Sequence, residues 1–321
     1  MKYTLKTINK LKKVYIHIGL NKTGSTFLQS KVFPHLGYKL LTQSSLELIE
    51  PYNDLMNQDE FDYNPDPLIQ YFNSNFENEN LLISDEAIPG RPIYRHTNRF
   101  RNAKRLNEIF PNAKILVFIR GQEDIMRSIY SQYVKGRMSG FQSPEQFFIS
   151  SKMNIHEEHE KKEQILKNYL SGEKYYLEML EYSKLINMYK SLFKDVEVCL
   201  YEDLKYDQKY IINSFNHFFQ IKLSQRLENI IKNGASLNTG LSNREIEIRK
   251  IANIIVNLPK SSFHAKLIRK LIFYYYRISV NNFSEEDSYK ILSDFYLKDN
   301  KILSLQVPRI LNYSDFYPLN N

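Results

Sequence analysis

A short loop near the N-terminus constrains the fold of this chain more than any other feature. The apolar run 14–18 predicts a buried strand, and the next residues are Gly19-Leu20-Asn21-Lys22-Thr23-Gly24-Ser25-Thr26-Phe27-Leu28-Gln29. A strand that leads into a small, hydroxyl-rich loop with one lysine, and then into a helix, is typical of a phosphate-binding site. In a nucleotide-triphosphatase loop a glycine directly precedes the lysine. Here Gly24 comes two positions after Lys22, which indicates an anion site of another kind.

Short apolar runs alternate with helical patterns along the first 200 residues. Buried strands are predicted at 14–18, 81–84, 114–119 and 196–200, with a short strand at 38–41. Helices are predicted over 23–33, 67–76, 96–109, 122–136, most of 144–193 and most of the chain after 207, while the rest of 51–80 is predicted to be irregular. This alternation predicts an α/β fold, a P-loop-like parallel β-sheet flanked by helices with a mostly helical C-terminal part. Ligands bind such sheets at the carboxyl ends of the strands, where the loops after residues 18, 84 and 119 fall.

Composition narrows the class of protein only in part. The 321 residues carry a formal net charge of +8, which indicates either a lysine-rich surface or an anionic partner. The one cysteine, Cys199, lies in an apolar run and cannot form an internal disulfide. No run approaches the roughly 20 apolar residues that a membrane-spanning helix needs, and no signal peptide is evident, so we expect a cytoplasmic protein.

A second motif lies about 100 residues after the loop. The predicted strand 114–119 ends in Arg120, and Ser128 follows eight residues later on the next helix. An arginine fork suits a phosphate, and a serine hydroxyl on the following helix can reach the same anion. Together the two motifs resemble those of the sulfotransferases that use 3′-phosphoadenosine 5′-phosphosulfate (PAPS), including bacterial and carbohydrate-modifying members. This chain has Gln122 and Ile125 where that family often has proline and a second arginine.

Two weaker similarities extend the resemblance over residues 14–242. The run Tyr201-Glu202-Asp203-Leu204 follows the strand at 196–200, as it often does in the family. The loop Ser236–Ser242 is similar to one that closes over the nucleotide, and Lys232 or Asn238 could supply a further phosphate contact there. We therefore expect a single domain over 1–321, with a cofactor-binding α/β core over 14–242 and a helical C-terminal cap over 243–321.

The resemblance implies a reaction and a donor site. A sulfuryl group would move in line from PAPS to a hydroxyl or amine of an acceptor, in particular a carbohydrate, leaving 3′-phosphoadenosine 5′-phosphate. Lys22 would stabilise the charge on the leaving oxygen, and no metal is expected because the sulfuryl group carries less negative charge than a phosphoryl group. The 5′-phosphate would be held by Lys22, Thr23, Gly24, Ser25 and Thr26. Arg120 and Ser128 would hold the 3′-phosphate.

The acceptor also needs a base to take its proton. Glu86 follows the strand 81–84 and is the leading candidate, and His96 is the second. The basic residues near Glu86 are interpreted either as a solvated helix face or as a docking surface for an anionic acceptor; they are Arg91, Arg95, Arg99, Arg101, Lys104 and Arg105.

Two other classes of function stay open from the residues. One is a nucleotide-dependent kinase on a P-loop fold, in which Asp85 at the end of a strand would bind a metal ion. The position of the glycine after the lysine, rather than before it, does not favour a kinase. A non-catalytic basic module would bind nucleic acid or a membrane surface, but no nucleic-acid recognition motif is present, and we expect no nucleic-acid partner.

Overall fold

The computed structural model describes residues 13–90, 98–136, 144–150, 175–234, 246, 289–290 and 292–319. They fall into two compact units, which are described separately. The first lies within 1–121, 182–237 and 299–314, and the second within 122–181, 238–298 and 315–321. The expectation of a single domain over 1–321 remains a prediction. Among the helices that the described residues form, none is long and apolar enough to cross a membrane.

The first unit is built on a five-stranded sheet in which every pairing is parallel. The strand order is β2-β3-β1-β4-β7, and the strands are β1 (Lys13–His17), β2 (Lys39–Thr42), β3 (Asn80–Ser84), β4 (Lys114–Ile119) and β7 (Asp195–Leu200). All five strands predicted from the sequence are present, and their ends agree to within one residue. The predicted α/β fold with a parallel sheet flanked by helices is therefore confirmed.

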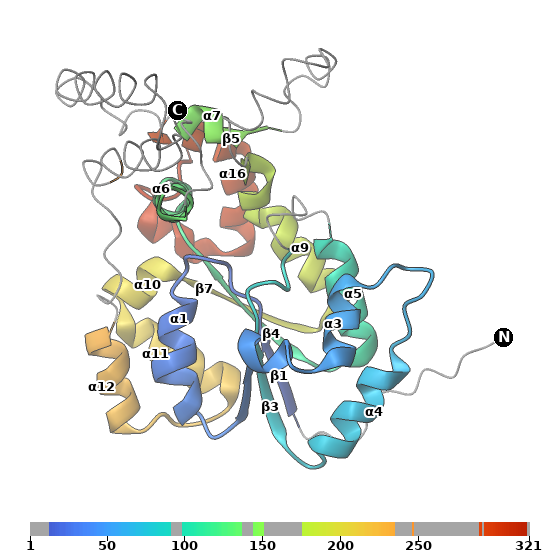
Figure 1. Ribbon diagram of the computed structural model, residues 1–321. Helices are drawn as coiled ribbons and strands as arrows, with labels where there is room; N and C mark the ends of the chain where they lie inside the picture. Colours follow the sequence, from blue (N-terminus) through green and yellow to red (C-terminus); the bar gives the residue numbers. More distant parts are fainter. Residues whose placement is uncertain are drawn as a thin grey trace, which may run out of the picture. The chain divides into compact units, whose positions relative to one another are not determined.

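Helices cover both faces of this sheet. Figure 1 shows α1, α11 and α12 on one side of it and α3, α5 and α9 on the other. The helical elements of the first unit are α1 (Ser25–Phe27), η1 (Leu28–Val32), η2 (Phe33–His35), α2 (Gln43–Leu46), α3 (Glu50–Asn57), α4 (Asp66–Asn75), α5 (Arg99–Ile109), α9 (Tyr182–Leu192), α10 (Tyr201–Tyr206), α11 (Gln208–Phe219), α12 (Gln225–Gly234) and η7 (Pro308–Tyr313). The helix α16 (Leu297–Gln306) lies mostly in this unit.

Successive side chains along each strand point to opposite faces of the sheet, so the core has two layers. Side chains such as Tyr15, Phe118 and Cys199 pack in one cluster with residues of α1, η1, α11 and α12. Their neighbours along the strands, such as Ile16 and Val117, are also fully buried and point to the opposite face. The three central strands β3, β1 and β4 are mostly buried on both faces because helices cover both, which explains why they read as continuous apolar runs.

The second unit contains one longer helix, α6, and several short elements. They are α6 (Gln122–Lys135), α7 (Pro144–Phe147), β5 (Phe148–Ile149), β6 (Tyr175–Tyr176), η5 (Leu177–Leu180) and η6 (Asp294–Tyr296). The prediction of helix over most of 144–193 is wrong at β5 and β6, which pair in parallel. These two strands have only two residues each and lie about 25 positions apart, so they are too short to give a periodic pattern in the sequence.

Two other predictions need correction in the first unit. The stretch 51–80 is less irregular than predicted, because it contains α3, whose start at Glu50 is followed by Pro51 in the first turn. The first helix begins at Ser25 rather than residue 23, because Gly24 before it has a left-handed backbone with φ of 92°. That helix changes at once to the π-helix η1 and ends in the 3₁₀ turn η2, which contains Pro34.

Candidate functional site

The loop after β1 and the residue after β4 lie at the topological switch point of the sheet. β1 and β4 are neighbours, but the chain leaves β1 toward β2 at one edge and leaves β4 toward β7 at the other. Open α/β sheets bind ligands at such a point, because the two departing connections leave a crevice at the carboxyl ends of the strands. The topology therefore brings the Lys22 loop and Arg120 to the place where a ligand is expected.

Positive φ angles and internal hydrogen bonds shape the loop. Lys22 and Gly24 have φ of 68° and 92°, and a Cβ at Gly24 would lie 3.1 Å from Cδ2 of Leu204. The hydroxyls of Thr23 and Ser25 donate to the carbonyl oxygen of Leu20 over 2.6 and 3.1 Å. These two buried hydroxyls close the loop on itself, while the first N–H groups of the following helix have no acceptor inside the helix.

Arg120 is held against the loop from several directions. Its Nη1 donates to the carbonyl oxygen of Lys22 over 3.2 Å, and its guanidinium lies 4.4 Å from the centre of the Tyr201 ring. The Tyr182 hydroxyl donates to the Arg120 carbonyl oxygen over 2.7 Å. These contacts give the guanidinium a defined place beside Lys22, as an anion-binding residue requires.

The Tyr-Glu-Asp-Leu run supplies part of this support. Tyr201 and Glu202 begin α10 directly after β7, and Oε1 of buried Glu202 accepts a hydrogen bond from the backbone N–H of Gly121 over 3.0 Å. The sequence resemblance singled out this run without giving its residues a role. No sequence signal pointed to Tyr182.

Glu86 lies on the other side of Lys22. It follows β3, the strand that pairs with β1 on the side away from β4. Burial raises the pKa of its carboxyl, and the neighbouring charge of Asp85 adds to that rise. A hydrogen bond with Ser25 and the positive charge of Lys22 act in the opposite direction and lower the pKa. The candidate base and the candidate catalytic lysine are therefore electrostatic neighbours.

Asp85 has a structural setting that differs from that of Glu86. Its Oδ2 accepts from the Tyr52 hydroxyl and its Oδ1 from the Ala87 backbone N–H, each over 2.8 Å. A carboxylate engaged in this way is poorly placed to hold a metal ion at the end of β3, as the kinase alternative requires. The described residues contain no group of three or more His, Cys, Asp or Glu side chains that could hold a metal.

A buried histidine connects β1 with β3 just below the loop. His17 Nδ1 lies 2.7 Å from Oγ of Ser84, and Gln29 Nε2 donates to that same Oγ over 2.9 Å. Burial lowers the pKa of His17 to about 3, so the ring is neutral at physiological pH. Through these contacts the helical segment that follows the loop is attached to Ser84 at the end of β3, two residues before Glu86. The sequence offered no signal for it.

Several predicted site residues lie elsewhere or outside the described part of the chain. Ser128 is half-buried on α6 in the second unit, and its joint contact with Arg120 remains a prediction. His96 and Asn238 fall outside the described residues, as do Arg91, Arg95 and the whole loop Ser236–Ser242. Lys232 pairs with Glu228 on its own helix over 3.5 Å.

Part of the basic segment after Glu86 has structural roles. Arg105 is 1% exposed and donates to the carbonyl oxygens of Leu55 and Gln58. Arg101 donates to the carbonyl oxygen of Met56 over 2.8 Å. These two guanidiniums hold the end of α3 against α5, which favours the structural interpretation over the docking surface at these positions.

No protein-family model matches the chain, and no curated protein sequence matches it. Solved structures do match it, and two of them are described here. One is described as a sulfotransferase from Alicyclobacillus acidocaldarius, with 15% identity over 75% of this chain and 90% of the other and a TM-score of 0.40. The second is described as the sulfotransferase domain from the Synechococcus PCC 7002 olefin synthase, with 14% identity over 83% and 96% of the two chains and a TM-score of 0.37.

Proposed function

We propose that the chain is a sulfotransferase that moves a sulfuryl group from PAPS to a hydroxyl or amine of an acceptor, in particular a carbohydrate. One observation carries the proposal: Lys22, Arg120 and Glu86 follow three adjacent strands of the sheet, with Lys22 neighbouring both of the others. Two cations suit a nucleotide that carries two separate phosphate groups. A carboxylate next to the lysine suits proton removal from an acceptor.

The donor site would divide between the two cations. The 5′-phosphate would lie in the loop 22–26, held by Lys22 and by backbone N–H groups. The Thr23 and Ser25 hydroxyls already bond the Leu20 carbonyl oxygen, so their residues would contribute through the backbone. Arg120 and Ser128 would hold the 3′-phosphate.

The chemical step needs one base and one electrophilic group. Glu86 takes the proton of the acceptor as the acceptor oxygen or nitrogen forms a bond to sulfur, and the bond from sulfur to the phosphate oxygen breaks. Lys22 stabilises the charge that develops on that leaving oxygen. A carboxyl whose pKa is raised by burial accepts a proton more readily than an exposed glutamate does.

The donor can be tested without knowing the acceptor. Titration calorimetry should show tighter binding of 3′-phosphoadenosine 5′-phosphate than of AMP or of ATP with Mg²⁺. Arg120→Ala should weaken binding of the 3′-phosphorylated nucleotide by about 10- to 100-fold, the range for a hydrogen bond to a charged group, and should change AMP binding little.

Arg226→Ala is the matched control, because Arg226 is an exposed arginine on α12 in the same unit. Equal affinities of the wild-type protein for AMP and the 3′-phosphorylated nucleotide would contradict the proposal. Preferred binding of ATP with Mg²⁺ would favour the kinase.

A further inference from the structure

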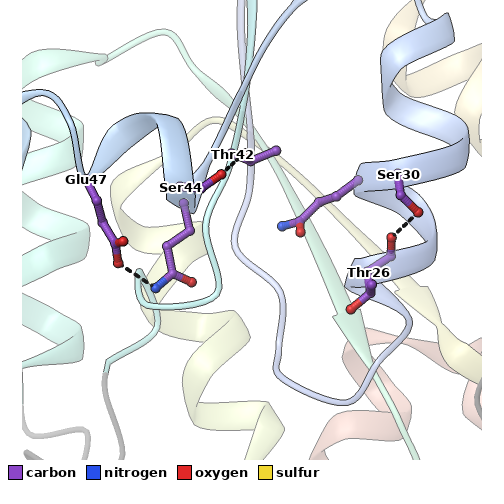
Figure 2. Close-up of a pocket in the computed structure, with 7 residues that line it drawn as sticks. Thr26, Ser30, Thr42, Ser44 and Glu47 are labelled. Carbon is purple, nitrogen blue, oxygen red and sulfur yellow. Dashed lines mark hydrogen bonds between the residues drawn. The ribbon is translucent and has the colours of Figure 1, made fainter.

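A polar pocket of about 420 Å³ opens in the first unit between the first helix and the end of β2. Figure 2 shows Thr26 and Ser30 on one wall and Thr42, Ser44 and Glu47 on the other. Gln29 and Gln43 complete the lining. Of these seven residues, the donor site proposed above uses only Thr26.

Every side chain of the lining carries a polar group. The seven side chains carry hydroxyls, amides and one carboxylate, and none of them is aromatic, wholly aliphatic or cationic. Hydroxyls and amides can both donate and accept hydrogen bonds, as the hydroxyl groups of a sugar ring do. A carboxylate accepts from such hydroxyls and repels an anion.

Internal contacts position the polar groups of the wall that Thr42, Ser44 and Glu47 form. Gln43 Nε2 donates to Glu47 Oε1 over 2.9 Å, and the hydroxyls of Thr42 and Ser44 lie 3.1 Å apart. A groove whose polar groups are already positioned loses less conformational entropy when it binds a ligand.

The pocket adjoins the reacting centre through two elements. Thr26 directly follows Ser25, the hydrogen-bond partner of Glu86. Gln29 donates to the Ser84 hydroxyl, two residues before Glu86 in the chain. A ligand in the pocket would therefore lie on the Glu86 side of Lys22, away from Arg120.

We propose that this pocket is the acceptor subsite and that it takes a neutral polyhydroxyl ligand, such as an uncharged sugar ring. The acceptor role rests on the proposed sulfotransferase function. Glu47 gives the pocket its selectivity, because its charge disfavours acceptors that already carry a carboxylate or sulfate. The engagement of Arg101 and Arg105 within the protein agrees with a neutral acceptor.

The test compares matched sugars on the full chain without nucleotide. Saturation-transfer NMR measures binding of the methyl glycosides of glucose, galactose and mannose, each beside its uronate, in which a carboxylate replaces the 6-hydroxymethyl group. At least one neutral glycoside should bind about tenfold more tightly than its uronate, as expected for a like charge roughly 6 Å away at an effective dielectric constant between those of a protein surface and water. Glu47→Gln should remove this preference, because the uronate no longer meets a like charge.

Ser30→Trp should abolish sugar binding by filling the pocket, and Ser44→Trp repeats this test from the opposite wall. Ser191→Trp is the matched control, since Ser191 is an exposed helical serine that bonds its own helix as Ser30 does. The subsite is overturned if no neutral glycoside binds in a way that both pocket variants remove, or if uronates bind the wild-type protein equally well.

Binding of 3′-phosphoadenosine 5′-phosphate to the same samples separates the two proposals. If the protein binds the nucleotide but no sugar, the acceptor subsite is overturned and the proposed function stands. If the protein binds sugar but not the nucleotide, both the proposed function and the acceptor role of the pocket are overturned.

Discussion

Lys22 and Glu86 influence each other's charge, although 64 positions separate them in the chain. Burial favours the neutral form of the Glu86 carboxyl, and the ammonium of Lys22 favours the ionised form. The balance leaves the pKa above its ordinary value, so the carboxylate would be present above that pKa and lost as the pH falls through it. A base that depends on one lysine in this way would ionise less readily if that lysine were removed.

Carboxyl carbon NMR titration can measure this coupling directly. Glu86 should titrate above the ordinary glutamate value in the wild-type protein, and Lys22→Met should raise its pKa further because the favourable charge is gone. Lys31→Met is the control, since Lys31 is an exposed lysine farther along the same helical segment. An unchanged Glu86 pKa in Lys22→Met would show that the two groups are not neighbours.

At the scale of elements, α10 links the site to a distant part of the chain. Tyr201 and Glu202 of α10 support Arg120 and Gly121, and the next residue, Asp203, is fully buried. Arg309 of η7 donates through Nε to Asp203 Oδ1 over 2.8 Å and also pairs with Asp207. The C-terminal segment thereby stabilises the helix that supports the arginine.

Loss of this ion pair should weaken the fold in a pH-dependent way. Burial already raises the pKa of Asp203, and Arg309→Ala removes the charge that opposes this rise. We expect the free energy of unfolding at neutral pH to fall by about 3–5 kcal/mol, as for a buried carboxylate that loses its partner. The folded-state pKa would then lie further above the unfolded value, so this loss should shrink as the pH falls through the folded-state pKa.

Urea unfolding at pH 7 and pH 5 measures this effect. Asp203→Asn combined with Arg309→Ala should recover part of the loss, because no charge remains buried. Arg226→Ala, at an exposed site, should change the unfolding free energy little. An equal loss for Arg309→Ala at both pH values would contradict the role of the Asp203 charge.

At the scale of the whole molecule, the net charge of +8 attracts anions to the surface. A nucleotide with phosphates at both the 3′ and 5′ positions carries more charge than AMP and should respond more strongly to this field. Salt screens the attraction between exposed charges beyond about 10 Å at 0.1 M.

Raising NaCl from about 0.05 to 0.3 M should therefore weaken binding of 3′-phosphoadenosine 5′-phosphate by about threefold to tenfold and that of AMP by less. Titration calorimetry of both nucleotides at three salt concentrations gives the two slopes. Equal slopes would mean that the 3′-phosphate lies away from the protein's positive charge.

Local patterns in the chain were sufficient for much of this architecture. Apolar runs predicted all five strands of the sheet, most clearly the central ones, because a strand buried on both faces must be apolar along its length. The same patterns placed Lys22 and Arg120 at strand ends. They missed α3 and the β5–β6 pair, since a proline-initiated helix in a polar stretch and a two-residue bridge give little periodic signal.

The sequence by itself determined the parallel α/β class and the polarity of the loop, because strand periodicity and loop composition are local properties. Only the tertiary structure decided which loops meet. The strand order sets β3 and β4 on either side of β1, and this brings Glu86 and Arg120 to Lys22. The packing of the fold also brings Tyr182 and Tyr201 to Arg120 and Gln29 to Ser84. A polar pocket lies next to Gln29. Such contacts join residues far apart in the chain, and they follow from how the sheet is assembled and its side chains pack, which no local pattern records.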